Sequence, residues 1–319
     1  MTSWTTTTIW PMDLLRVGDL TCISLAELMD LAVRMKAEPN AWTQALAGQS
    51  LACLLDGPST RTRLSAGAAA HRLGMAPVTL HSEDLELERR DAIADIGRTL
   101  SSYVSAVVAR SVAHDTLVAL ARAASVPVIN VHSPAHHPCQ ALADLLTLRE
   151  RFGALEGLAL AYVGPANDVA RSLMDAGALA GMDLRLACPP GHRPREEDRV
   201  GAEILAERHG GAVAVLADPR AAVAGADAVY TAPWPEPVRA GNGAARMRAY
   251  HVDGRLMRLA RPAAIFMHCL PAHRGEEVDA SVIDGRHSVV WDQVANRLPI
   301  EQAIIYALAT ADRAQPEVP

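Results

Sequence analysis

Residues 50–74, SLACLLDGPSTRTRLSAGAAAHRLG, constrain the fold more than any other part of the sequence. The apolar run at 51–55 has the length of a buried strand, and Asp56-Gly57-Pro58 ends it. Ser59 then stands where the N-cap of a helix is expected. A strand, a tight break and a helix in this order predict one step of an α/β sheet.

The start of this helix is also a candidate anion site. The first turn of a helix offers unpaired backbone N–H groups and a partial positive charge. Thr60-Arg61-Thr62-Arg63 adds two hydroxyls and two guanidiniums to that turn. Helix capping explains Ser59 alone, whereas the crowding of hydroxyls and arginines favours a receptor for a phosphate or a similar dianion.

Apolar runs of strand length alternate with helical segments along the rest of the chain. The expected strands cover residues 51–55, 77–80, 106–109, 126–131, 158–163, 184–188, 213–216, 228–231 and 264–268. The first expected helix begins at Ser24, with Glu27 completing a capping box. The other expected helices cover residues 60–73, 92–103, 117–124, 138–152, 169–180 and 300–311.

This alternation predicts an α/β protein with two doubly wound parallel sheets joined by interdomain helices. We expect a first domain at residues 1–146, closed by a C-terminal helix at 300–319, and a second domain at 147–299. At 319 residues with 50% hydrophobic and 21% charged residues, the chain is long enough for two cores.

Composition excludes several classes of function. A net charge of -6 argues against binding to nucleic acid, which requires clustered Lys and Arg. The five cysteines are scattered without a CxxC motif, so neither a disulfide framework nor a zinc knuckle is expected. No charge-free apolar stretch reaches membrane-spanning length, and the first residues lack the pattern of a signal peptide. We therefore expect a cytoplasmic protein with no membrane partner.

Ligands of open α/β sheets bind beyond the carboxyl ends of the strands. The polar side chains that follow the expected strands are Arg61, Arg110, His137, Gln140, Asn167, Asp168, His268 and Cys269. Each one alone has a structural explanation, such as a strand terminator or a small buried thiol. Their joint placement favours a ligand site. A dinucleotide-dependent oxidoreductase is disfavoured because the turn at 164–168 lacks the GxGxxG spacing.

Three motifs now identify a family: STRTR at 59–63, HPCQALADLLTLRE at 137–150 and FMHCLPAHRGEEV at 266–278. They resemble the signatures of the aspartate/ornithine carbamoyltransferases, and DGRHSVVWDQVANRL at 284–298 resembles the ornithine branch. The resemblance covers nearly the whole chain. It implies a first domain for carbamoyl phosphate, a second domain for an amine acceptor, no cofactor or metal, and a homotrimer with shared active sites.

The resemblance also assigns residues to the donor. Those that would bind carbamoyl phosphate are Ser59, Thr60, Arg61, Thr62, Arg110, His137, Gln140, Cys269, Leu270 and Arg297. The catalytic group among them would be Arg61, Arg110, His137, Gln140 and Cys269. These residue types suit the reaction, in which a neutral amine attacks a carbonyl carbon and phosphate leaves. Donors aimed at the carbonyl oxygen stabilise the developing charge, and arginine compensates the departing phosphate.

The acceptor half departs from the ornithine pattern. The acceptor-binding residues would be Asn167, Asp168, Trp234, Glu236, His268 and Cys269. Asp168 replaces an Asn that would face the ornithine carboxylate, and two like charges repel in a closed site. Ala232 replaces the Asp that would pair with the α-amino group, and Glu236-Pro237 replaces a Ser-Met pair.

From these differences we expect an acceptor other than free L-ornithine. The first alternative is an ordinary ornithine carbamoyltransferase that makes citrulline, with the acceptor loop realigned. A catalytically silent regulatory relative is the second. In the loop at 81–91, Glu86 matches the position that reaches a neighbouring site, with Arg89 or Arg90 as the contacting cation; a solvated charged loop is the other interpretation.

Overall fold

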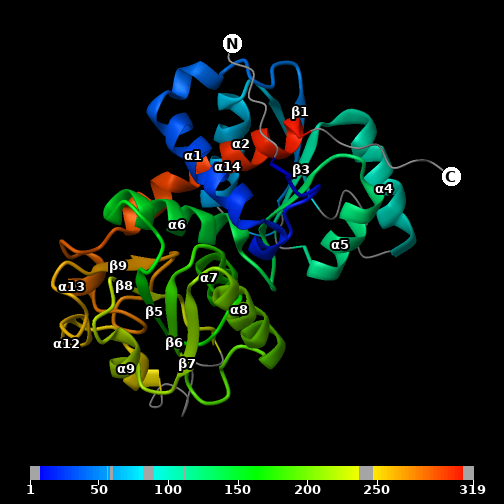
Figure 1. Ribbon diagram of the computed structural model, residues 1–319. Helices are drawn as coiled ribbons and strands as arrows, with labels where there is room; N and C mark the ends of the chain where they lie inside the picture. The colour runs from blue at the N-terminus through cyan, green and yellow to red at the C-terminus, as the bar shows by residue number, and fades with distance from the viewer. Residues whose placement is uncertain are drawn as a thin grey trace. The chain divides into compact units, whose positions relative to one another are not determined.

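The computed structural model describes residues 8–55, 57, 60–81, 90–110, 112–236 and 247–311. The chain divides into two compact units, Met1–Cys139 with Leu298–Pro319 and Gln140–Arg297. From the sequence we placed the boundaries after residues 146 and 299. Each unit contains one parallel sheet with helices beside it (Figure 1), so the predicted α/β class with two parallel sheets is confirmed.

The sheet of the first unit has the order β2-β1-β3-β4, and all its pairs are parallel. Its strands are β1 (Ser50–Leu55), β2 (Ala76–Leu80), β3 (Ala106–Arg110) and β4 (Val128–His132). The helices and short 3-10 turns of this unit are η1 (Val17–Asp19), α1 (Cys22–Ala37), η2 (Pro39–Trp42), α2 (Thr60–Arg72), α4 (Arg90–Tyr103) and α5 (His114–Ala123). β1 is buried from Leu51 to Leu55, as the apolar run predicts.

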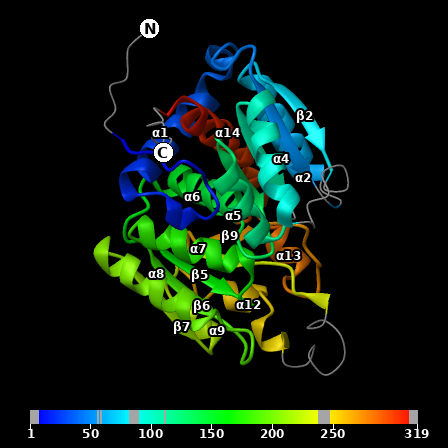
Figure 2. The same ribbon diagram turned by 90° about the vertical axis from the view of Figure 1, so that its right-hand side faces the viewer.

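One face of this sheet is covered by α4 and α5, which lie side by side in both views (Figures 1 and 2). Side chains alternate along a strand, so Ala52 and Leu54 of β1 point to the same face and join the core under these helices. Gly97 of α4 permits the close approach. A Cβ at this position would lie 2.8 Å from the Ala123 methyl and 3.1 Å from the α5 backbone.

Several helices begin before the residue expected from the sequence, and the structure explains the difference for α1 and α14. α1 begins at Cys22 because Thr21, not Ser24, is the N-cap: the Thr21 hydroxyl accepts from the Ser24 N–H at 3.1 Å. Glu27 accepts instead from the Thr8 hydroxyl. α14 (Val290–Thr310) begins ten residues before the expected start and runs through Pro299. The helix expected from the sequence began directly after this proline, but buried side chains on both sides of it keep the helix continuous.

The sheet of the second unit has the order β7-β6-β5-β8-β9, again all parallel. Its strands are β5 (Ala159–Val163), β6 (Asp183–Ala187), β7 (Ala212–Leu216), β8 (Ala228–Thr231) and β9 (Ile265–His268). Its helices are α6 (Pro138–Phe152), which begins in the first unit, α7 (Asp168–Leu179), α8 (Glu196–Arg208), α9 (Pro219–Val223), η3 (Arg248–Tyr250), α12 (Gly254–Met257) and α13 (Ala280–Ile283). The chain order reverses at β5, which pairs with β6 on one side and β8 on the other. Ligands of such sheets bind at this switch point.

The two faces of this second sheet bury different side chains. Val163 and Phe266 join an apolar core that includes Trp234. Tyr162 and Tyr230 are register partners on β5 and β8, and their rings stack with centroids 6.0 Å apart. Burial raises the pKa of both phenols well above the ordinary value.

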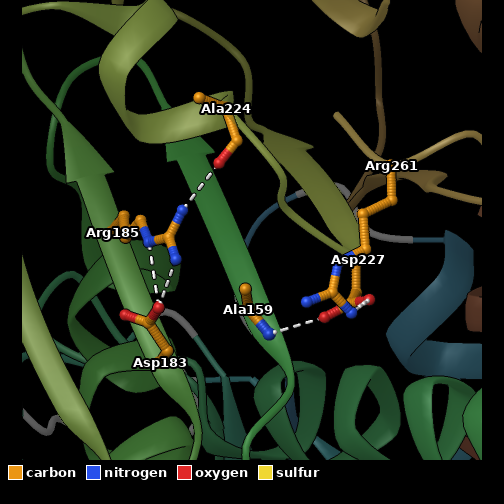
Figure 3. Close-up of polar contacts among 6 residues, drawn as sticks. All are labelled: Ala159, Asp183, Arg185, Ala224, Asp227 and Arg261. Atoms are coloured by element: carbon orange, nitrogen blue, oxygen red, sulfur yellow. Dashed lines mark hydrogen bonds and ion pairs between the residues drawn. The ribbon is translucent and has the colours of Figure 1, made fainter. Parts of the chain in front are cut away.

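Two carboxylates fasten the amino-terminal edge of this sheet, opposite to the strand ends where a ligand would bind (Figure 3). Asp227 accepts from the Ala159 N–H at 2.9 Å and from Arg261 at 2.7 Å. Asp183 forms an ion pair with Arg185, whose guanidinium also donates to the Ala224 carbonyl at 2.9 Å. These contacts hold the starts of β5, β6 and β8 in place.

All five cysteines are free thiols. Among the helices of the described ranges, every one is too short or too polar to traverse a lipid bilayer.

Candidate functional site

In the first unit, three strands end side by side. Leu55 of β1 pairs with Arg110 of β3, and Arg110 pairs with His132 of β4 across a bulge. α2 opens directly beyond β1 with Thr60-Arg61-Thr62-Arg63. Ser59, like Glu86 and Arg89 of the expected loop, lies outside the described residues.

Arg110 is held at the centre of this row. Its Nη1 donates to the Thr62 hydroxyl at 3.4 Å and lies 3.0 Å from Nδ1 of His132. Because a guanidinium can only donate, His132 must accept through Nδ1. The His132 ring also stacks on the His137 ring, with centroids 4.5 Å apart. The arrangement orients Arg110, and it brings Thr62 and His137 to the same strand ends.

The arginines of the α2 turn separate into two roles. Arg63 points back and donates to the Leu55 carbonyl at 2.9 Å, so it fixes the end of β1. Thr60 and Arg61 are exposed on the first turn, while Thr62 is buried. Arg61 is therefore the arginine of this turn that can reach a ligand in solvent.

In the second unit, α6 and α14 share a stripe of buried polar contacts. Asn296 donates to the Thr147 hydroxyl at 3.0 Å and to the Glu150 carboxylate at 2.8 Å. The next residue of α14, Arg297, donates to Oε1 of Gln140 at 3.0 Å. Both Gln140 and Arg297 are almost fully buried, at 4% and 5% exposure. The two predicted donor-binding residues of these helices are thus in direct contact.

Asp144 lies at the centre of this stripe and is completely buried. Its Oδ1 accepts from Nε2 of Gln140 and from Nε2 of Gln293, both at 2.8 Å. Burial raises the pKa of Asp144 to about 6, while these amides, the Tyr230 hydroxyl and Arg297 favour the charged form and limit the rise. Near neutral pH the carboxyl group is therefore mainly ionised.

The segment after β9 carries His268, Cys269 and Leu270. The His268 N–H donates to Oε1 of Gln293 at 2.9 Å, and Nδ1 of His268 accepts from the Leu270 N–H at 2.8 Å. Leu270 has a φ of 54°, a left-handed conformation that is unfavourable for a residue with a branched side chain. The imidazole therefore holds a strained backbone whose carbonyl was predicted to contact the donor. His268 itself is buried at 1% exposure.

Glu277 completes the support of this segment. Its carboxylate is fully buried, accepts from the His273 N–H, and lies 3.5 Å from Nε2 of His268 and 3.5 Å from Nδ1 of His273. Burial works to raise the pKa of Glu277, but the nearby His268 imidazole and two backbone N–H groups outweigh it and hold the pKa below its usual value. His273, Glu276 and Glu277 also place potential ligand atoms within 4.8 Å of one another. We assign no metal to this group, because Glu277 is already engaged by N–H and imidazole groups.

The acceptor residues lie at the ends of β5 and β8. Asn167 is the N-cap of α7: its Oδ1 accepts from the Ala170 N–H at 3.0 Å and from the Tyr162 hydroxyl at 3.3 Å. Its NH₂ group therefore faces away from the helix. Asp168 is half-buried on the first turn, and Trp234 is buried, whereas Glu236 is exposed.

Sequence reasoning missed four residues that orient the predicted ones: His132, Asp144, Glu277 and Gln293. Asp144 stands four residues after Gln140, on the same helix face, and Glu277 lies in the motif at 266–278. Both of these positions can be recognised in the sequence. The pairing of α6 with α14, which brings Gln293 to Asp144, cannot be recognised there.

The two parallel-sheet units, one with an arginine–hydroxyl cluster and the other with a buried amide–carboxylate network, have the architecture of an α/β protein with polar groups at its strand ends. Comparison with known proteins then places it. The family model for the aspartate/ornithine carbamoyltransferase carbamoyl-P binding domain matches residues 12–150, and the model for the Asp/Orn binding domain matches residues 156–308. The chain belongs to the aspartate/ornithine carbamoyltransferase family and is a carbamoyltransferase.

Its relatives are named ornithine carbamoyltransferases. The protein from Acidothermus cellulolyticus is 45% identical over 296 residues, which are 92% of this chain and 95% of that protein. The one from Symbiobacterium thermophilum is 44% identical over 304 residues, 94% and 98% of the two chains. The solved structure from Pyrococcus furiosus matches with a TM-score of 0.89 at 40% identity, covering 95% of this chain and 98% of that one.

These relatives overturn one expectation. We inferred an acceptor other than free L-ornithine from Asp168, Ala232 and Glu236, but near-full-length relatives at 44–45% identity are ornithine carbamoyltransferases. The inference was wrong; it rested on three differences taken together and on a gap-free match of the acceptor loop to the ornithine pattern. The first alternative, citrulline formation, is the better supported reading.

Proposed function

We propose that this protein transfers the carbamoyl group of carbamoyl phosphate to the side-chain amine of L-ornithine, giving citrulline and phosphate. The observation that carries the proposal is the near-full-length match of both domains to ornithine carbamoyltransferases. Within each unit, described residues that were predicted to bind the donor contact one another, and this supports the proposal.

In the proposed reaction, the first unit binds the phosphate. The first turn of α2 supplies N–H groups, the Thr60 hydroxyl and Arg61, and Arg110 lies beside it against Thr62. A helix N-terminus together with guanidiniums suits a dianion. Arg110 and His137 would also donate to the carbonyl oxygen of the donor, where negative charge develops as the amine attacks.

The second unit would bind the carbamoyl nitrogen and the acceptor. Oε1 of Gln140 and the Leu270 carbonyl are acceptors for the carbamoyl NH₂ group, with Arg297 and Cys269 beside them. The neutral δ-amine of ornithine forms the new C–N bond, the C–O bond to phosphate breaks, and the amine releases its surplus proton.

For ornithine itself, we propose Asn167 and Asp168 as the recognition pair. The outward NH₂ group of Asn167 at the α7 N-terminus suits the α-carboxylate. Asp168 would balance the α-ammonium and so take over the task that Ala232 cannot perform. Asp168→Asn should then raise the KM for ornithine by roughly tenfold or more with little change in donor affinity.

The function is tested by assaying citrulline from ornithine and carbamoyl phosphate, with N-acetylornithine, putrescine and lysine as competing acceptors. We expect ornithine to give the highest kcat/KM, and Arg61→Ala to abolish turnover and weaken carbamoyl-phosphate binding in a folded protein. Turnover with another acceptor and none with ornithine would overturn the assignment.

We further propose that the enzyme is a cytoplasmic homotrimer whose active sites are shared between neighbours. Light scattering tests the stoichiometry. If sites are shared, mixing Arg61→Ala chains with chains altered at residues 81–91 should restore activity in the hybrids. Full activity in a monomer would end this part of the proposal.

A further inference from the structure

Asp144 is not among the residues that were predicted to touch the donor. It contacts Gln140, which is one of them, and Gln293, which holds the segment after β9. It lies one turn after Gln140 on α6, and no part of it is exposed. Gln140 and Gln293 both direct their Nε2 atoms at its Oδ1, each at 2.8 Å. One carboxylate thus binds the amide groups of two different helices.

An ionised carboxylate can only accept hydrogen bonds, and this property fixes the direction of both amides. With Nε2 turned to Asp144, Oε1 of Gln140 must point the other way, where it accepts from Arg297 at 3.0 Å. Oε1 of Gln293 likewise points away and accepts from the His268 N–H at 2.9 Å. Reversing either amide would place an NH₂ group against another donor, which is costly in a buried site.

We propose that Asp144 is a positioning residue of the transferase: its carboxylate sets the direction of the Gln140 amide and, through Gln293, anchors the segment from His268 to Leu270. The acceptor atoms for the carbamoyl NH₂ group, Oε1 of Gln140 and the Leu270 carbonyl, would then both depend on this one group. The inference rests on the proposed role of Gln140 in donor binding and is independent of which amine is the acceptor.

A purely structural role would not require a carboxylate at this position. An Asn has nearly the same shape and would avoid the cost of a buried charge. Both amides meet the same oxygen, so an Asn could still accept from them; turned over, however, it would present its NH₂ group to both, and it therefore does not fix their direction. Arg297 on α14 and the Tyr230 hydroxyl on β8 are the charged and titratable groups that face Asp144 besides the two amides. Arg297 holds the Gln140 amide in the same direction from its Oε1 end, whereas the Tyr230 hydroxyl, which can donate or accept, fixes neither amide.

The test uses Asp144→Asn in the full-length protein and compares two ligands by calorimetry, carbamoyl phosphate and inorganic phosphate. Both ligands contain the phosphate group, but only carbamoyl phosphate carries the NH₂ group that Gln140 and Leu270 would bind. We expect the affinity for carbamoyl phosphate to fall by roughly 10- to 100-fold, the loss of one to two charge-assisted hydrogen bonds, and the affinity for phosphate to stay within about twofold.

A second variant separates the two amides. Gln293→Leu removes the contact of Asp144 with α14 and leaves the Gln140 amide between Asp144 and Arg297. We expect Gln293→Leu to lower the affinity for carbamoyl phosphate less than Asp144→Asn does, because only the anchor of the segment from His268 to Leu270 is lost, and to leave the affinity for phosphate within about twofold.

Asp227→Asn is the matched control, because it alters a buried Asp of the same unit at the opposite sheet edge and should leave both affinities unchanged. Equal loss of phosphate and carbamoyl-phosphate affinity in Asp144→Asn, or a greater loss of carbamoyl-phosphate affinity in Gln293→Leu than in Asp144→Asn, would refute the positioning role. If Gln140→Ala leaves carbamoyl-phosphate affinity intact, the donor-site assignment fails instead. Weaker binding in Gln140→Ala with unchanged binding in Asp144→Asn removes only the present inference.

Discussion

Glu277→Gln should destabilise the protein in a pH-dependent way. The substitution keeps the shape of the side chain and removes its charge from a position with no solvent exposure. In the wild type, the carboxylate accepts from the His273 N–H and lies 3.5 Å from Nε2 of His268. Both contacts involve Oε1, so an amide oxygen can keep them only in their weaker neutral form, while the NH₂ group replaces Oε2, which lies 3.5 Å from Nδ1 of His273, too far for a good hydrogen bond.

The magnitude follows from these contacts. A hydrogen bond to a charged group contributes about 1.5–3 kcal/mol and a neutral one about 0.5–1.5 kcal/mol, so the exchange loses about 1 kcal/mol. A donor left without a good acceptor in a buried site costs about 1–2 kcal/mol more. We therefore expect the free energy of unfolding at pH 7 to fall by about 2–3 kcal/mol.

The pH dependence has a definite sign. The pKa of Glu277 is lowered in the folded protein, so its stabilising effect is complete above the unfolded pKa of about 4.3 and is lost as the pH falls through the lower folded value. The stability difference between wild type and Glu277→Gln should therefore be constant from pH 7 to about 5 and shrink in more acidic solution.

Urea unfolding followed by tryptophan fluorescence measures this difference, because Trp234 and Trp291 both lie in the unit that contains Glu277. Glu277→Ala provides an upper bound for the loss. Carbamoyl-phosphate affinity should decline as well, since His268 would hold Leu270 less firmly. A variant as stable as the wild type at pH 7, or a difference that persists unchanged in acid, would refute the reasoning.

Three further predictions concern other parts of the molecule. Carbamoyl-phosphate affinity should fall as the pH drops below about 6, where Asp144 gains a proton, and Asp144→Asn should lack this step in calorimetry. Because the pKa of Asp144 is higher in the folded than in the unfolded protein, this protonation favours the folded state. A loss of affinity caused by unfolding would therefore contradict the assignment. Gly97→Ala should lower the free energy of unfolding by roughly 1–3 kcal/mol, because the new methyl group overlaps α5. Gly67→Ala, where a Cβ would meet no atom within 4 Å, should be neutral or stabilising by up to about 1 kcal/mol. Equal shifts of the melting temperature would be inconsistent with this packing. Asp227→Ala should lower the free energy of unfolding in urea by roughly 2–3 kcal/mol, because it leaves the buried Ala159 N–H unpaired. Arg261→Ala, which removes the exposed partner of an ion pair, should lower it by under about 1 kcal/mol. The reverse order would contradict the account of this sheet edge.

The sequence predicts much of the fold because the strands of a parallel sheet are buried on both faces and appear as apolar runs. Each expected strand is present within two residues of its predicted bounds. The errors occur where a boundary depends on a specific contact. Ser24 and Thr21 are both good cap residues, and only the hydrogen bonds select Thr21. Pro299 is a frequent helix boundary, and only packing shows that α14 continues through it.

The candidate site was predictable as a set of residues but not as a network. Arg110, His137, Gln140 and Cys269 follow from strand ends and from the family motifs. His132 was missed because its role depends on a β-bulge that pairs it with Arg110. Contacts between Asp144 and Gln293 join residues far apart in the sequence, and helical periodicity alone does not show which helices face each other.

The stacked pair of Tyr162 and Tyr230 gives the second unit an internal optical reporter. A phenolate absorbs at longer ultraviolet wavelength than a phenol, and an accessible tyrosine ionises near pH 10. Because burial holds both of these pKa values well above that, the pair should remain colourless in this band through the alkaline range in which accessible phenols ionise. Their absorbance should rise only when the sheet of this unit opens. An alkaline stopped-flow experiment would thus measure the rate at which β5 and β8 separate, without any added label.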